Sequence, residues 1–116
     1  MTNEQMETLL EHMQDEELQV RHVAQKEYAH GDALGNFNRL AEQLHMDRKQ
    51  VLWVYMQKHF DGILAYINGF KSQREDVRGR IKDARLYLAL LRGMIEEEEQ
   101  HANAGIGHES AETVGR

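Results

Sequence analysis

The chain contains no cysteine and no proline among its 116 residues. Without cysteine it forms neither disulfide bonds nor thiolate sites, so zinc ribbons and thiol catalysis are excluded. Proline is the residue that most strongly interrupts helices, and its absence favours long, unbroken ones. No apolar run approaches the roughly 18 residues of a membrane span, and the acidic N-terminus is unlike a signal peptide. We therefore expect a cytoplasmic protein that does not associate with membranes.

Basic residues are also in short supply, because 14 Lys and Arg stand against 20 Asp and Glu, giving a net charge of −6. The acids are concentrated at the two ends: residues 1–32 carry eight acids and two bases, and residues 96–116 carry six acids and one base. Residues 70–95 instead carry seven bases and three acids. A basic segment can hold phosphate, whereas the negative total argues against a general nucleic-acid coat protein.

Apolar residues recur at the three- and four-residue spacing of helices in four segments of the chain. The predicted helices cover residues 4–29, 33–45, 48–68 and 72–99. Residues from His101 onward show no such spacing and are small or polar. The sequence therefore predicts an all-α, four-helix bundle-like single domain over residues 1–100, followed by a disordered tail over residues 101–116.

Local patterns indicate where these helices begin and which faces they bury. Capping boxes are formed by Ser72 with Glu75 and by Asp47 with Gln50, and Gly69 can supply a left-handed stop. The expected inner face of the first helix consists of Met6, Leu9, Leu10, Met13, Val20, Val23, Ala24 and Tyr28. That of the fourth consists of Val77, Ile81, Ala84, Leu88, Leu91 and Ile95. Pairing the long fourth helix with another copy would bury its remaining apolar surface, so we expect a homo-oligomer.

A polar row runs beside the apolar face of the fourth helix and consists of Asp76, Arg80, Asp83 and Tyr87. It lies roughly 100° round from that face, because each residue of a helix turns by about this much. Such a row faces either solvent or a cleft between helices. His59 lies on the apolar side of the third helix, so a cleft would bring it close to Asp83, whereas an outward-facing row would keep the two apart.

Several polar residues on the inner flanks of different helices favour the cleft. They are Lys26, Asn36, Lys58, His59, Arg80 and Asp83. In a ligand site the three cations would contact phosphates, and Asn36 would read a base or a ribose. Asp83 would bind a metal or orient Arg80. The alternative for His59 is a core histidine held by one hydrogen bond.

The sequence also fits a helix-turn-helix whose turn lies at Met46 and Asp47. DNA recognition would then use the side chains of Arg48, Lys49, Gln50 and Trp53. Antiparallel helices in any bundle give the same apolar spacing, and the next turns of the third helix are largely apolar, so packing alone is the favoured explanation of the pattern.

Metal-dependent hydrolysis would require several carboxylates from two helices, because Mg²⁺ prefers oxygen ligands in an octahedron. Glu16 and Glu17 resemble the start of such a set, but the residue three positions after Glu17 is Val20. Asp83 is likewise preceded by Arg80, where a second carboxylate would be wanted. The run Glu96 to Glu99 is interpreted as a solvated helix end that frays, because its charges oppose the negative helix terminus.

The order of short motifs resembles a phage family. These motifs are Lys26-Glu27-Tyr28, Asn36-Phe37, Lys58-His59, Asp83, Tyr87-Leu88 and Leu90-Leu91. Together they resemble the nucleotide modification-associated domains of phage genomes, which are similar to the all-α nucleotide pyrophosphatase (MazG-like) group. The resemblance covers residues 25–95. It implies a helical domain that binds or acts on nucleotides, usually as an oligomer, in an infected bacterial cell.

The resemblance also implies site residues. Lys26, Tyr28, Asn36, Lys58, His59 and Asp83 match the polar signature of the family, and Phe37 and Leu88 match its packing signature. The MazG-like acidic quartet is not present as a set, because Arg80 replaces the acid of the ExxD element. The resemblance therefore implies a nucleotide-binding protein, and Mg²⁺ would be its cofactor only if it hydrolyses nucleotides. A third hypothesis is a ligand-free protein whose helices engage a host or phage partner.

Overall fold

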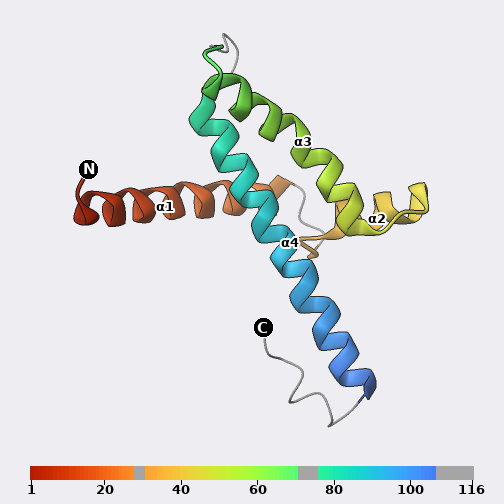
Figure 1. Cartoon of the computed structure of the whole chain (residues 1–116). Helices are drawn as coiled ribbons and strands as arrows, with labels where there is room; N and C mark the ends of the chain where they lie inside the picture. Colours follow the sequence, from red (N-terminus) through yellow and green to blue (C-terminus); the bar gives the residue numbers. More distant parts are fainter. Residues whose placement is uncertain (28–30, 71–75, 107–116) are drawn as a thin grey trace.

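The computed structural model describes residues 1–27, 31–70 and 76–106. These residues form four helices and no strand, which confirms the prediction of an all-α, bundle-like fold. The helices are α1 (Asn3–Glu27), α2 (Gly35–Leu44), α3 (Arg48–Ile67) and α4 (Val77–Ile106) (Figure 1). None of the helices in these ranges has the length and apolar character needed to cross a membrane.

The antiparallel pair of α3 and α4 is the main packing unit of the molecule (Figure 1). The short α2 packs against α3, at the end of the pair where α3 begins. Within the described chain, α1 packs on α4 alone, and it lies across α4 rather than along it. As a result the N-terminal half of α1 projects away from the other helices.

The hydrophobic core lies where α2, α3 and α4 meet. Its buried members are Leu34, Phe37, Val51, Leu52, Met56 and Met94, with Leu40, Ala41, Phe60, Tyr87, Leu90 and Leu91 packed around them. Leu52, Met56 and Met94 are fully buried. The buried core residues thus come from α2 and the residue before it, from α3 and from α4, and α1 contributes none of them.

Two predicted faces differ from the structure. The stripe of α4 that faces the core is Ala84, Tyr87, Leu91 and Met94, whereas Leu88 and Ile95 of the predicted face are exposed. The expected inner face of α1 is also largely exposed, including Leu9 and Val23. Both differences have one cause: α1 crosses α4 and covers only a short part of it, so neither helix buries its whole apolar face in this chain.

Side-chain caps mark three of the helix starts. The backbone N–H of Thr2 donates to Oε1 of Gln5 and the N–H of Gln5 donates to Oγ1 of Thr2, at 2.8 and 3.0 Å, which is a reciprocal capping box. Asp47 accepts from the N–H of Lys49 at 2.7 Å, as expected of a cap. At α4 the capping carboxylate is that of Asp76, which accepts from the N–H of Arg78 at 2.8 Å. The described part of α4 starts at Val77, and the predicted cap at Ser72 lies outside the described residues.

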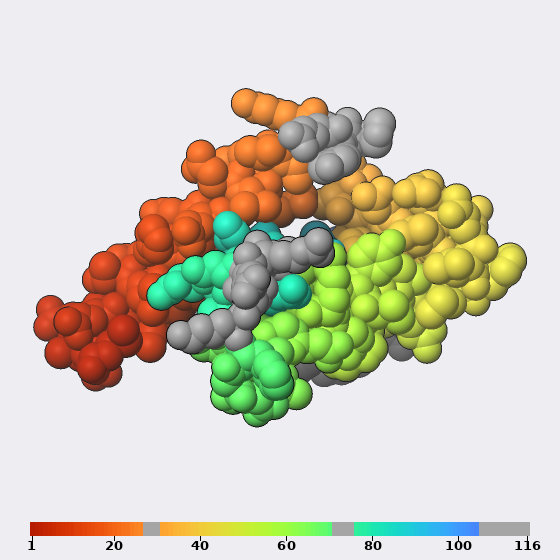
Figure 2. Space-filling view, turned by 90° about the horizontal axis from the view of Figure 1, so that it is seen from above, coloured from red at the N-terminus to blue at the C-terminus, as the bar shows by residue number. Residues whose placement is uncertain are grey.

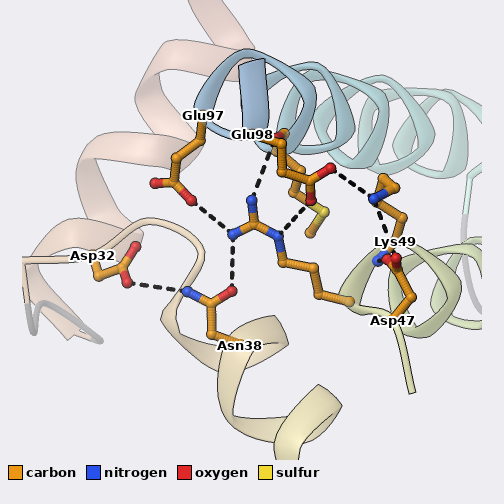
Figure 3. A network of polar contacts seen from close by, with 8 residues as sticks. Asp32, Asn38, Asp47, Lys49, Glu97 and Glu98 are labelled. Carbon is orange, nitrogen blue, oxygen red and sulfur yellow. Dashed lines mark hydrogen bonds and ion pairs between the residues drawn. The ribbon is translucent and has the colours of Figure 1, made fainter. Parts of the chain in front are cut away.

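The far end of α4 is held by a network around Arg48 (Figure 3). Its guanidinium group donates to Oδ1 of Asn38 at 2.9 Å and to the Met94 carbonyl at 3.3 Å. It also forms ion pairs with Glu97 at 2.7 Å and Glu98 at 3.2 Å. The network therefore links α2 and the start of α3 to the C-terminal part of α4.

The same network corrects the expectation that the acidic run frays. Lys49 adds a second ion pair to Glu98, at 2.8 Å, so two of the four glutamates are paired with cations at the start of α3. α4 continues past Glu99 to Ile106, and residues 101–106 are helical rather than part of the predicted tail. The rest of that predicted tail, residues 107–116, lies outside the described residues.

Candidate functional site

The imidazole of His59 and the carboxylate of Asp83 face each other across the α3–α4 pair. Nδ1 of His59 lies 3.8 Å from Oδ2 of Asp83. The His59 side chain is 5% exposed, whereas that of Asp83 is 44% exposed. The polar row of α4 therefore lies against α3 at this point, which places a buried histidine beside a carboxylate that ligands can reach.

An aromatic ring lies beside the buried imidazole and is part of a small aromatic cluster. The Tyr87 ring lies 5.5 Å from that of His59, and Phe37 makes edge contacts with Tyr87 and Tyr55 at 6.1 and 5.6 Å. Burial raises the pKa of the Tyr87 phenol, and the nearby Asp83 and Tyr55 raise it further. Tyr87 consequently remains a neutral hydrogen-bond donor at physiological pH.

These residues line an open cavity of about 1120 Å³ between the four helices. Its walls comprise residues of α1 near Ala24, the residues before α2, and one face each of α2, α3 and α4. Figure 2 shows the molecule hollowed between the end of α1, α2 and α3, with α4 deeper in the same region. The volume is slightly above the roughly 300–1,000 Å³ of typical small-molecule pockets, so the cavity has room for such a ligand.

Four of the seven predicted site residues line this cavity: Asn36, Lys58, His59 and Asp83. Arg80 does not line it, because its side chain extends over α3 and donates to the Lys58 carbonyl at 3.0 Å. Lys26 is exposed on α1 and also lies outside the lining. Tyr28, the seventh, lies outside the described residues. The structure thus brings together the predicted residues of α2 and α3, and it adds Asp83, one of the two predicted on α4.

The cavity also includes cations that were not predicted as site residues. Arg21 of α1 and Arg39 of α2 line it together with Lys58 of α3. Arg39 donates to Oδ1 of Asn36 at 3.3 Å, which orients both side chains at the α2 wall. The signal for Arg39 was its position three residues after Asn36, since this spacing places two residues on one face of a helix. Arg21 has no comparable signal, because the apolar spacing of the first helix predicts that the neighbouring Val20 is buried in the core.

Two residues proposed for DNA recognition, and one considered for metal binding, form ion pairs within the chain. Arg48 and Lys49 form the ion pairs with Glu97 and Glu98 described above, and reading DNA would require these pairs to break. Glu17 is paired with Arg85, with Nε of the arginine 2.6 Å from Oε2 of the glutamate. In the ranges that the structure describes, no three His, Asp or Glu side chains are grouped so as to hold a metal ion.

Comparison with protein-family models, curated proteins and solved structures gives no match for this chain.

Proposed function

We propose that this protein binds a nucleotide or a nucleotide-derived ligand in the cavity between its four helices. The observation that carries the proposal is the approach of His59 to Asp83, at 3.8 Å, in a wall that also contains tyrosine rings and cations. A nucleotide combines a flat aromatic base, a sugar with hydroxyl groups and a negative phosphate. The cavity offers a matching group for each of these parts.

The phosphate would lie against Arg21, Arg39 and Lys58, which come from three different helices. Guanidinium groups bind phosphate oxygens through paired N–H donors, and a lysine ammonium adds a mobile positive charge. Three cations and two acids, Asp32 and Asp83, line the cavity, so its charged residues sum to +1 and form a local exception in a chain whose total charge is −6. This exception favours a small anion over a long nucleic acid.

The base and sugar would lie against the inner wall. Tyr55 and Tyr87 present aromatic surface there, and bases stack on such rings with a gain of roughly 1–3 kcal/mol per base. The Asp83 carboxylate accepts hydrogen bonds from sugar hydroxyls or base N–H groups, and the amide of Asn36 both donates and accepts. His59, being buried, would hold Asp83 in position.

The cavity lining includes two carboxylates, Asp32 and Asp83, beside its cations, amide and aromatic rings. We propose binding without turnover, because hydrolysis of the MazG-like kind needs a complete acidic set, and Arg80 stands in the place of one of its acids. The enzymatic alternative is a magnesium-dependent release of pyrophosphate from a nucleoside triphosphate, as the resemblance to the MazG-like group implies. It predicts pyrophosphate formation that requires Mg²⁺ and is abolished by Asp83→Ala. The phage origin and the bacterial host cell implied by the same resemblance belong to this proposal.

A thermal-shift screen tests the proposal, because a ligand that binds only the folded protein raises its melting temperature by mass action. The probes are nucleoside mono- and triphosphates, cyclic oligonucleotides, the matching nucleosides and divalent metals alone. We expect a phosphorylated compound to raise the melting temperature and its nucleoside to raise it less. Calorimetric titration of that compound should then show weaker binding to Lys58→Ala, and unchanged binding to Lys82→Ala, whose side chain does not line the cavity. If no nucleotide raises the melting temperature, the proposal is wrong.

A further inference from the structure

The N-terminal half of α1 is an amphipathic arm without a partner helix along its apolar face. Met6, Leu9 and Leu10 project from one side of the arm and are exposed by 44, 38 and 40%. The arm stands away from the rest of the molecule in Figure 1. Most helices in proteins gain their stability by packing an apolar face, not from helix propensity alone. An arm of this kind is therefore suited to a surface on another molecule.

A matching surface lies on α4, next to the point where α1 already packs. There Arg85 pairs with Glu17 of α1 and lies 3.6 Å from the Met13 sulfur. Leu88, Arg92 and Ile95 follow Arg85 at helical spacing and continue the same face of α4. Leu88 and Ile95 are exposed by 46 and 39%, since α1 crosses α4 and does not extend over them. The exposed face thus continues a contact that α1 and α4 make within one chain.

From this geometry we propose that the α1 arm of one copy packs on the Leu88–Ile95 face of α4 in a second copy. The contact would repeat the chemistry of the intrachain one, in which apolar and acidic side chains of α1 meet apolar and arginine side chains of α4. Two-fold symmetry would form it twice, because each copy offers one arm and one such face. The expected homo-oligomer is then a dimer, and this inference does not depend on the ligand.

Charge favours this pairing over an arm-to-arm contact. The first 32 residues carry eight acids and two bases, so two arms lying together would bring like charges into contact. Over Val77–Ile106, α4 carries five bases and five acids, so it does not present a net negative charge to the arm of the other copy. A different apolar stripe on the outer side of α3, which contains Trp53, Leu64 and Ile67, is a competing surface that the experiment must distinguish.

The first test is the mass in solution of the full chain and three variants, measured by light scattering at tens of micromolar. We expect the wild type at twice the 13.5 kDa of one chain. Leu9→Glu and Leu88→Glu should be monomers, with helicity by circular dichroism unchanged because both side chains are exposed. Leu64→Glu on α3 is the matched control and should remain a dimer. A monomeric wild type, or a Leu64→Glu variant that alone dissociates, would overturn the proposal.

The second test locates the contact by disulfide formation, for which the natural lack of cysteine provides a clean background. Chains carrying Leu9→Cys and Leu88→Cys are purified separately, mixed, allowed to exchange and oxidised. We expect a disulfide between the two different chains. Leu9→Cys mixed with Leu64→Cys should give none. Efficient disulfide formation by Leu9→Cys alone would indicate arm-to-arm pairing, and crosslinking to Leu64→Cys would indicate the α3 stripe; either result refutes the inference.

Discussion

The side chain of Arg80 passes directly over Gly62, on its way from α4 to the Lys58 carbonyl of α3. A Cβ atom at residue 62 would overlap the Cδ and Nε atoms of Arg80. Glycine is therefore required at this position by a neighbouring helix and not by its own backbone. The contact fixes where α3 and α4 approach each other, one turn from His59.

Gly62→Ala should consequently fail to give the stabilisation that alanine normally brings to a helix. Alanine is favoured over glycine inside a helix by about 1 kcal/mol, but here Arg80 must move and lose its hydrogen bond, at a cost of ~0.5–1.5 kcal/mol. Gly93→Ala is the matched control, because a Cβ there meets no atom within 4 Å. We expect urea denaturation to show a higher free energy of unfolding for Gly93→Ala and no gain, or a loss, for Gly62→Ala.

A double variant checks the cause. When Arg80→Ala is already present, the obstacle is gone, and adding Gly62→Ala should then raise the free energy of unfolding by about 1 kcal/mol. If Gly62→Ala is equally unfavourable with and without Arg80, the overlap with its side chain is not the reason.

Arg48→Ala should destabilise the protein by ~2 kcal/mol, because it removes charge-assisted hydrogen bonds from a side chain that is only 14% exposed. The change leaves the Met94 carbonyl and Asn38 without this donor. Amide hydrogen exchange should also become faster in residues 97–104, at the end of α4 that Arg48 holds. Arg78→Ala is the control: its pair with Asp76 is exposed, and such pairs contribute little. Equal effects of the two substitutions would contradict the role given to Arg48.

The sequence predicted the all-α fold, because helical spacing of apolar residues indicates helices directly. The approach of His59 to Asp83 was one of two outcomes that the spacing allowed, because the polar row of α4 could face either solvent or a cleft between helices. The buried face of α4 differs more from the prediction. Leu88, on the predicted face, is exposed, whereas Met94 is fully buried. Both are apolar residues of one helix, and only the partner helices decide which of them is covered. Spacing alone does not say that α1 crosses α4.

The network around Arg48 could not be predicted from local pattern either. Arg48 and Glu97 are 49 residues apart in the chain, and their ion pair depends on how α3 and α4 are aligned. The acidic run was therefore assigned to a fraying end, on the basis of its position in the helix alone. In the structure Glu97 and Glu98 pair with cations of α3 within 3.2 Å, Glu96 pairs with Arg92, and the helix continues beyond them.

The stability of the protein should fall in acid partly through Glu98. Its pKa is lowered by the hydrogen bond from Lys49 and also by Arg48, so the folded state favours the ionised carboxylate. A lowered folded pKa means that the contribution of Glu98 is present above the ordinary value of 4.5 and is lost as the pH falls through the folded value. We expect the difference in free energy of unfolding between the wild type and Glu98→Gln to be constant near neutral pH and to shrink below pH 4.5. A difference that does not change with pH would exclude the ion pairs as its source.

Tyr87 should be the last to ionise among the three tyrosines in the described ranges when the pH is raised. Its pKa is raised by burial first and then by the charges of Asp83 and Tyr55. Because the pKa is raised in the folded state, the contribution of the protonated Tyr87 phenol to the free energy of unfolding is complete below the ordinary value of 10. It is lost as the pH rises through the folded value. Absorbance at the tyrosinate band should show a late component that Tyr87→Phe removes. Asp83→Asn should shift this component to lower pH without removing it, because burial of the phenol is the larger cause and persists in that variant. A titration of Tyr87→Phe that keeps the late component would show that the buried phenol beside His59 is not the group responsible.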